Sequence, residues 1–193
     1  MSKQQEPKLS DENDADHPAS VFLKHIAALD AGDKAILKRV AGCTIADARG
    51  AMSVFYRILP HEVPQWDRDV YFLVATLYCL ESTSPLRHKG NFGTTMRRVR
   101  RNFDSKSLDR RMNALIDSRL EEGELGYRLR QAVKLAYSKN VAVDWRRLVI
   151  DLTHWSHTNH YIQQQWVEAY YGKEYGKKNT SNDNNEEKQQ GDA

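Results

Sequence analysis

The fold is decided by the stretch at residues 66–80, WDRDVYFLVATLYCL. Its apolar residues fall on nearly every side of a helical wheel, which predicts a helix that is buried almost all round. Pro64 and Asp67 mark the start of this helix. The pattern places Trp66 in the core beside Val70, and we expect the whole helix to form the buried centre of an N-terminal lobe.

Helical periodicity continues on both sides of this stretch, and no segment alternates with period two for long enough to form a strand. Gly32 is expected to end the first helix and Asp33 to cap the second, while Thr158 is expected to cap the last. The sequence therefore predicts an all-α fold of about nine helices in two packed helical bundles. The other helices are expected at residues 18–31, 33–42, 47–59, 92–103, 107–116, 125–140, 144–155 and 158–171.

Polar, aperiodic segments divide the chain into five parts. Disordered tails are predicted at residues 1–17 and 177–193, where apolar residues are few. The N-terminal helical lobe is expected at 18–81, a hinge at 82–91, and a basic C-terminal helical lobe at 92–176.

The composition favours a soluble cytoplasmic protein. The N-terminus is acidic and lacks the apolar core of a signal peptide, and the apolar stretch at residues 70–80 is too short to span a bilayer. Cys43 and Cys79 lie among apolar neighbours, so we expect both to be small buried core residues in a reducing compartment. Two cysteines alone make neither a disulfide framework nor a zinc site.

Positive charge is concentrated in one segment. The chain has 193 residues and a net charge of +3, but residues 86–147 hold sixteen Lys and Arg against seven Asp and Glu. Residues 1–18, by contrast, carry two basic residues and five acidic ones. A positive field of this kind attracts a polyanion through steering and counterion release.

The basic residues avoid the apolar stripe of their helices. Arg97, Arg100 and Arg101 stand at i, i+3 and i+4, which predicts one exposed cationic face. Three further helices repeat this pattern of basic residues with no matching acidic residues. Arginines also outnumber lysines in the segment, which favours contacts in which one guanidinium donates two hydrogen bonds to a phosphate. A plainer alternative is a set of solvated faces with local ion pairs, such as Asp109 near Arg110. We expect sequence-independent, salt-dependent phosphate binding.

Motifs of enzymes, metal sites and cofactor sites are missing from the sequence. There is no glycine-rich phosphate loop, no paired carboxylates in an apolar setting and no nucleophile elbow. Histidines 154, 157 and 160 would spread over about 240° of a helical wheel and could not share one metal ion. We therefore expect no enzymatic activity, no cofactor and no metal, and we interpret these histidines as surface or capping residues.

Several short motifs follow one another in a specific order. Together they resemble the small subunit of the type I-E CRISPR surveillance complex, Cascade, which is the CasB family. The resemblance covers about residues 21–171. The motifs are FGTTMRR at 92–98, SLDRRM at 107–112, LR at 129–130, DWRRL at 144–148 followed by Asp151, Leu152 and Trp155, QQW at 164–166 and YY at 170–171.

The resemblance implies a role in antiviral defence as an all-helical, non-catalytic subunit that stabilises a crRNA-guided complex. Such subunits occur as two copies stacked head to tail, so a second copy of the chain is one implied partner. The backbone subunits that coat the guide RNA, and the large subunit, are others. The target DNA and the displaced strand of the R-loop complete the set, held in a basic groove; no membrane is involved.

The motif positions and the basic helix faces together give a set of expected nucleic-acid contacts. Two alternatives stay open: a standalone helical nucleic-acid-binding protein, and a pure scaffold whose arginines bridge only protein partners. The expected contact residues are Lys38, Arg39, Arg68, Arg97, Arg98, Arg101, Arg110, Arg111, Arg119, Arg128 and Arg130.

Overall fold

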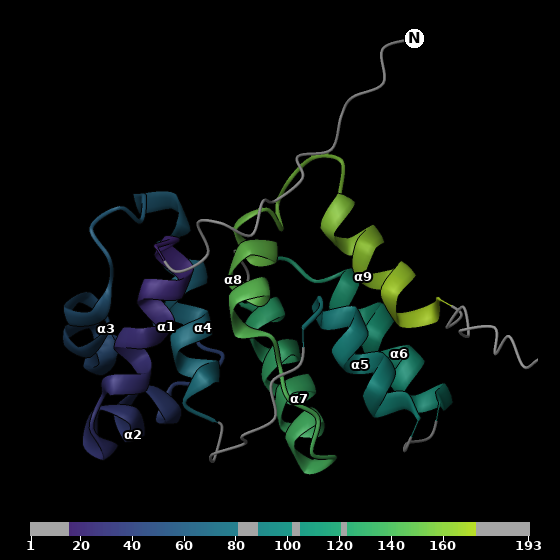
Figure 1. The fold of residues 1–193 in the computed structure, drawn as a ribbon, viewed down its shortest axis with the longest axis horizontal. Helices are drawn as coiled ribbons and strands as arrows, with labels where there is room; N and C mark the ends of the chain where they lie inside the picture. The colour runs from purple at the N-terminus through teal and green to yellow at the C-terminus, as the bar shows by residue number, and fades with distance from the viewer. Residues whose placement is uncertain (1–15, 81–88, 102–104, 121–122, 173–193) are drawn as a thin grey trace, which may run out of the picture.

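The computed structural model describes residues 16–80, 89–101, 105–120 and 123–172. Within these ranges it contains nine α-helices, two short 3-10 helices and no strand, so the predicted all-α fold is confirmed (Figure 1). The predicted C-terminal tail, nearly all of the N-terminal tail and residues 82–88 of the predicted hinge lie outside the described residues.

The first two helices meet at a different residue from the one predicted. Helix α1 is Pro18–Ala28 and helix α2 is Ala31–Arg39. The Oδ1 atom of Asp30 accepts a hydrogen bond from the backbone N–H of Asp33 at 2.8 Å, which is a helix N-cap. The prediction that Gly32 ends the first helix was therefore wrong, because the aspartate cap begins α2 before the glycine is reached.

The remaining helices follow the predicted order, with shifts at their ends. Helix α9 begins after His160, a left-handed residue with φ 48°, and not after Thr158 as predicted. These elements are η2 (Arg49–Ala51), α3 (Met52–Ile58), η3 (Gln65–Asp67), α4 (Arg68–Tyr78), α5 (Phe92–Arg100), α6 (Ser105–Ile116), α7 (Glu124–Ser138), α8 (Trp145–Thr153) and α9 (Tyr161–Tyr171).

Helix α4 is the centre of the molecule. Every residue from Val70 to Leu77 is buried. The helix contacts α1 and α2 on one side and α7 and α8 on the other (Figure 1). Trp66, however, is 81 % exposed, so its predicted core position was wrong. It lies in η3, before the regular helix begins, and the helical period does not extend back to it.

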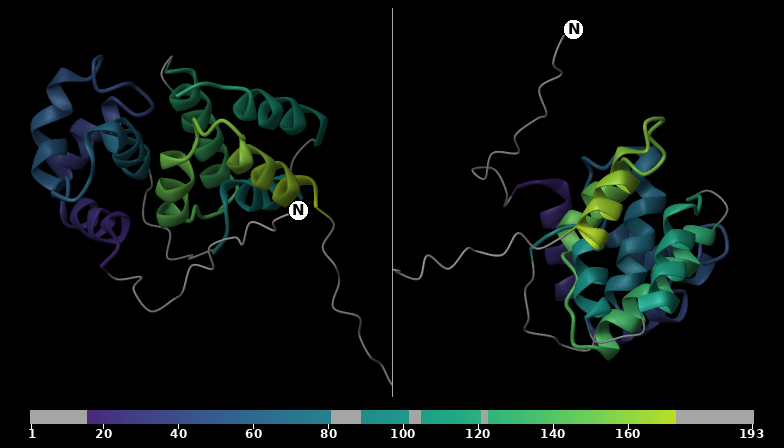
Figure 2. Two further views of the ribbon diagram at one scale, coloured as in Figure 1. Left: turned by 90° about the horizontal axis from the view of Figure 1, so that it is seen from above. Right: turned by 90° about the vertical axis from the view of Figure 1, so that its right-hand side faces the viewer.

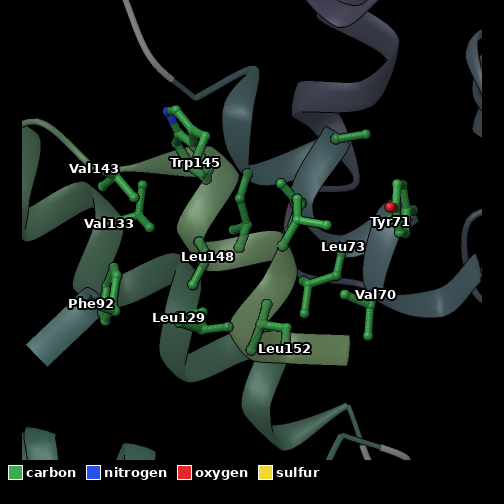
Figure 3. Close-up of a cluster of buried hydrophobic side chains, with 14 of the residues drawn as sticks. Val70, Tyr71, Leu73, Phe92, Leu129, Val133, Val143, Trp145, Leu148 and Leu152 are labelled. Carbon is green, nitrogen blue, oxygen red and sulfur yellow. The ribbon is translucent and has the colours of Figure 1, made fainter. Parts of the chain in front are cut away.

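One apolar core runs through both predicted lobes. Figure 3 shows Val70 and Leu73 of α4 facing Leu148 and Leu152 of α8, with Leu129 of α7 beside them. Residues from either side of the predicted hinge thus share one hydrophobic cluster.

Two close backbone approaches fix how the helices pack. A Cβ atom on Gly93 would lie 2.0 Å from the carbonyl oxygen of Trp166, so α5 and α9 touch backbone to backbone. Figure 2 shows α9 lying across α5. A Cβ on Gly126 would lie 2.5 Å from the carbonyl oxygen of Gly42, which brings α7 against the turn after α2. Only glycine fits at positions this close to another backbone.

A buried carboxylate joins α8 to α9. Asp151 is fully buried, and it accepts hydrogen bonds from the Nε1 of Trp166 at 2.6 Å and from the Nε of Arg147 at 2.7 Å. Arg147 also donates to the Oε1 of Gln165 at 3.2 Å. Burial raises the pKa of Asp151, while the two donors act in the opposite direction. The donors thus stabilise the charged form that burial disfavours.

The two cysteines differ in their surroundings. Cys79 is buried, as predicted, whereas Cys43 is exposed, so its predicted core position was wrong. Cys43 follows Gly42, a left-handed residue with φ 82°, in the loop after α2. None of the described helices combines the length and apolarity needed to cross a membrane.

Substitution of Gly93 by alanine is expected to destabilise the fold, because the new methyl group would overlap the Trp166 carbonyl. We expect a loss of about 2 kcal/mol or more in the free energy of unfolding, measured by urea titration. Gly50→Ala is the matched control, since nothing lies within 4 Å of a Cβ there. Equal stabilities of the two variants would contradict the close approach.

Substitution of Asp151 by alanine is expected to cost about 2–4 kcal/mol of unfolding free energy, because it leaves the buried Trp166 indole without an acceptor and removes the partner of Arg147. Thermal and urea unfolding followed by circular dichroism measure this loss. Asp117→Ala, at an exposed aspartate, serves as the control. An Asp151→Ala variant as stable as that control would refute the structural role of the carboxylate.

Candidate nucleic-acid interface

Arg100 does not belong to the exposed cationic face that the spacing predicts. Its Nε lies 3.1 Å from the Oδ1 of Asp109 on α6, and its guanidinium lies 5.4 Å from the ring centroid of Tyr170 and 5.5 Å from that of Tyr171. Tyr170 donates to Asp109 at 2.7 Å. Arg100 therefore ties α5 to α6 and α9, and the prediction of one exposed face was wrong for this residue.

Other arginines also have carboxylate or hydroxyl partners, contrary to the expectation of no matching acids. Arg147 pairs with Asp151, and the Nε of Arg128 donates to Glu124 at 3.0 Å, one turn earlier on α7. The Nε of Arg146 donates to the hydroxyl of Ser20 on α1 at 3.0 Å. Part of the basic excess is thus used inside the fold, which lowers the number of cations available to a polyanion.

A second group of cations makes no side-chain hydrogen bond, ion pair or ring contact with the described residues, which excludes Arg68 because it lies over the ring of Tyr56. These side chains are exposed or half-exposed, and no described carboxylate neutralises them. They are the members of the predicted set best placed to contact phosphates. We call them the unpaired cations: Lys38, Arg39, Arg97, Arg98, Arg110 and Arg130.

Three of the unpaired cations come from two helices that meet at the turn after α2. Lys38 and Arg39 are exposed in the last turn of α2. The Cβ of Arg130 on α7 lies 3.2 Å from the position that a Cβ on Gly42 would occupy. The Nε of Arg130 is buried and has no hydrogen-bond partner. The close contact between Gly126 of α7 and Gly42 therefore places Arg130 against the turn that follows Lys38 and Arg39.

The positive charge of Lys38 also acts on the thiol of Cys79 at the C-terminal end of α4. Burial raises the pKa of the Cys79 thiol to about 11, while Lys34 and Lys38 act to lower it. Cys79 is the C-cap of α4, so Lys38 lies near the C-terminus of that helix, where a cation is favourable.

Arg68 lies at the opposite end of α4. It is the first residue of that helix, and its guanidinium is 6.0 Å from the ring centroid of Tyr56. An eleven-residue helix is about 16 Å long, so Arg68 lies at the far end of α4 from Cys79, the residue on which the charge of Lys38 acts. The structure does not bring Arg68 together with the basic turn after α2.

The other predicted contacts lie on α5, α6 and their ends. A Cβ on Gly172 would lie 3.9 Å from the Nη1 of Arg97, which places this guanidinium at the C-terminus of α9. Arg98 is half-exposed and Arg110 is exposed. Arg101, Arg111 and Arg119 are exposed, and each makes a further contact within the chain. The predicted residues thus cover several surfaces of the molecule.

The histidine-rich segment offers no metal site among the described residues. His154, His157 and His160 are exposed, and the described part of the chain holds no group of three possible metal ligands. The rings of His154 and His157 pack against Tyr161, with centroids 6.2 and 5.2 Å away. These contacts agree with the interpretation of surface residues.

Comparison with known proteins places the chain in a family. Residues 33–171 match the family model of the CRISPR-associated protein Cse2. A curated relative, the CRISPR-associated protein Cse2 of Thermus thermophilus, is 32 % identical over 110 residues. That match spans 56 % of this chain and 59 % of the relative, so a substantial part of each protein lies outside it.

Solved structures share the fold over most of both chains. The CasB of M. ruber is 27 % identical, with a TM-score of 0.66, and the match covers 80 % of this chain and 92 % of that one. The CasB of Thermus thermophilus is 25 % identical, with a TM-score of 0.67, covering 81 % and 99 %. A chain of a CRISPR RNA-guided surveillance complex, 23 % identical, has the same fold at a TM-score of 0.66 and covers 79 % and 90 %.

The matched residues include every motif on which the predicted resemblance rests, from FGTTMRR at 92–98 to the tyrosines at 170–171. That resemblance is confirmed: this chain is similar to CasB in fold and sequence, and it belongs to the Cse2 family of CRISPR-associated proteins.

Proposed function

We propose that this chain is a non-catalytic subunit of a crRNA-guided surveillance complex of the Cascade type. Membership of the Cse2 family supports this role, as does the shared fold with a chain of a CRISPR RNA-guided surveillance complex. In the proposed complex two copies of the chain contact the subunits that coat the guide RNA, and the large subunit. They stabilise the assembly and hold the target and displaced strands of the R-loop.

The observation that carries the nucleic-acid part of the proposal is the surplus of unpaired cations. Ion pairs within the fold occupy Arg100, Arg128 and Arg147, yet the six unpaired cations have no such partner among the described residues. Five of these six cations are arginines, the side chain that proteins favour for the bidentate recognition of anions. Phosphate groups fit this requirement, because a guanidinium can donate two hydrogen bonds to one phosphate.

The spread of the unpaired cations favours contacts along a nucleic-acid backbone. They come from α2, α5, α6 and α7, whereas base reading concentrates several side chains on one element inside a groove. R-loop formation is nearly balanced in free energy, since one duplex replaces another. A few backbone contacts to the strands are therefore enough to favour the open state, whatever the sequence of the target.

Neutralising two unpaired cations, Arg98→Gln with Arg110→Gln, is expected to weaken target binding by the assembled complex about tenfold near 0.15 M salt. The slope of log affinity against log salt should become shallower by about 1.4–1.8, because two phosphate contacts are lost. Filter binding at several salt concentrations measures both quantities, and the loss should be the same for unrelated target sequences.

The control for this pair neutralises Arg49 and Arg57, two exposed arginines of the N-terminal half outside the predicted set. Arg57 pairs with Asp33 at the surface, so a melting curve of the control verifies that its fold is retained. The control changes the net charge equally and should leave affinity and slope within about twofold of the wild-type values. Equal losses in both double variants would attribute the effect to net charge and contradict specific contacts.

The proposed assembly also predicts a stoichiometry. Native mass spectrometry of the complex reconstituted with guide RNA is expected to show two copies of this chain per guide, in the wild type and in the Arg98→Gln, Arg110→Gln variant alike. If the variant failed to assemble, its arginines would bridge protein partners, and the scaffold alternative would replace strand holding.

A further inference from the structure

A cavity of about 820 Å³ lies between the C-terminal end of α6, the turn that joins α8 to α9, and α9 itself. Ile116, Leu120 and Val167 provide apolar parts of its lining. Of the predicted nucleic-acid contacts, only Arg119 lies in this lining. We call this hollow the α6/α9 cavity. Its volume is large enough for a long side chain or a small ligand.

The α6/α9 cavity contains a buried acceptor that the described part of the fold leaves unused. Gln163, in the first turn of α9, lines the cavity and is only 7 % exposed. Its Nε2 donates to the carbonyl oxygen of Trp155 at 2.7 Å, whereas its Oε1 is buried without a hydrogen-bond partner among the described residues. The amide cannot turn round, because Oε1 would then face the Trp155 carbonyl oxygen. A buried acceptor without a partner is costly, so this site favours a donor from outside the chain.

Two carboxylates line the same cavity. Asp117 directly follows α6 and Glu168 stands on α9, and both side chains are exposed. Neither makes an ion pair with the residues that the structure describes. Arg119 also lines the cavity, but it already makes a further contact within the chain. The cavity therefore presents two unpaired carboxylates together with one unused amide oxygen.

We infer that the α6/α9 cavity receives the ammonium or guanidinium group of a lysine or arginine side chain from a neighbouring protein subunit. This inference rests on the proposed function, which supplies the neighbouring subunits. It gives the chain an acidic docking site that is separate from the unpaired cations and from their contacts with the strands.

The donors of a basic side chain match the acceptors of the cavity. An ammonium group has three N–H donors and a guanidinium group five, and neither group accepts a hydrogen bond. Such a group can donate to the Oε1 of Gln163 while Asp117 and Glu168 compensate its charge, which are the two conditions for taking a cation out of water. The aliphatic part of a lysine or arginine side chain would lie along the apolar lining.

Charge complementarity also selects among the possible occupants. The phosphate groups of a nucleic-acid strand would be repelled by the carboxylates of Asp117 and Glu168, and an acidic protein segment would be repelled for the same reason. A basic protein segment gains from both carboxylates. The α6/α9 cavity and the unpaired cations are therefore suited to partners of opposite charge.

The test neutralises the two carboxylates and measures docking before any target DNA is present. The probe is the guide-bearing complex assembled without this chain, immobilised for biolayer interferometry. Asp117→Asn with Glu168→Gln is expected to raise the dissociation constant about tenfold and to make it less dependent on salt. Glu62→Gln with Asp69→Asn, at two exposed carboxylates outside the cavity, is the matched control and should bind as the wild type does.

Two single variants occupy the cavity from within and remove its buried acceptor. Gln164→Lys, at an exposed position one turn before Glu168, supplies a cation from the chain itself and is expected to weaken docking about tenfold. Gln65→Lys, exposed and outside the cavity, adds the same charge and is its control. Gln163→Met removes the acceptor at nearly constant volume and should weaken docking about fivefold. Circular dichroism melting curves verify that each variant retains the fold.

Each outcome bears on the inference. Weaker docking by the folded variants of the cavity, with both controls unaffected, supports it, whereas unchanged docking by the folded Asp117→Asn, Glu168→Gln variant overturns it. If that variant docks normally but loses binding to a mixed-sequence single-stranded oligonucleotide, the cavity is a nucleic-acid site. If it docks normally but alters self-association in sedimentation, the occupant is a second copy; both results overturn the inference. A wild-type chain that does not bind the complex at all refutes the proposed function, and the inference with it.

Discussion

The arrangement of the C-terminal helices depends on one buried carboxylate. Asp151 accepts from Trp166 and Arg147, so it fixes α9 relative to α8 while its charge is compensated. The same α9 lies against α5 through the backbone contact at Gly93, and Arg100 joins α5 to α6. Loss of these contacts would leave α5 less firmly held against α6 and α9, and the proposed phosphate contact of Arg98 depends on the position of that helix.

Local signals in the sequence predicted the helices well, because their causes are local. The helix expected from residue 144 begins there, since the Oδ1 of Asp144 accepts a hydrogen bond from the backbone N–H of Arg147 at 3.0 Å, and the apolar residues 70–77 of α4 are buried as predicted. Two failures have a common reason. The start of α2 and the exposure of Trp66 depend on where the chain turns before a helix, and periodicity says little about turns.

The roles of individual arginines could be predicted only in part. The pairing of Arg128 with Glu124 follows the i, i+4 rule and is readable from the sequence. The pairing of Arg100 with Asp109 joins two helices, and Tyr170 completes it from a third, so no spacing rule reveals it. The spacing assigns Arg97 and Arg100 to one exposed face, whereas the fold gives Arg100 an internal carboxylate and leaves Arg97 without one among the described residues. Only the tertiary structure, which brings Asp109 of α6 beside Arg100, distinguishes the two arginines.

This division of the arginines is the central claim, and a cryo-electron microscopy structure of the complete complex bound to target DNA tests it most directly. The account predicts that Arg98 and Arg110 lie within hydrogen-bond distance of phosphate oxygens, while Arg100 and Arg147 keep Asp109 and Asp151 as partners. A structure in which Arg100 or Arg147 has left its carboxylate to bind a strand, with Arg98 and Arg110 far from any phosphate, would contradict the account.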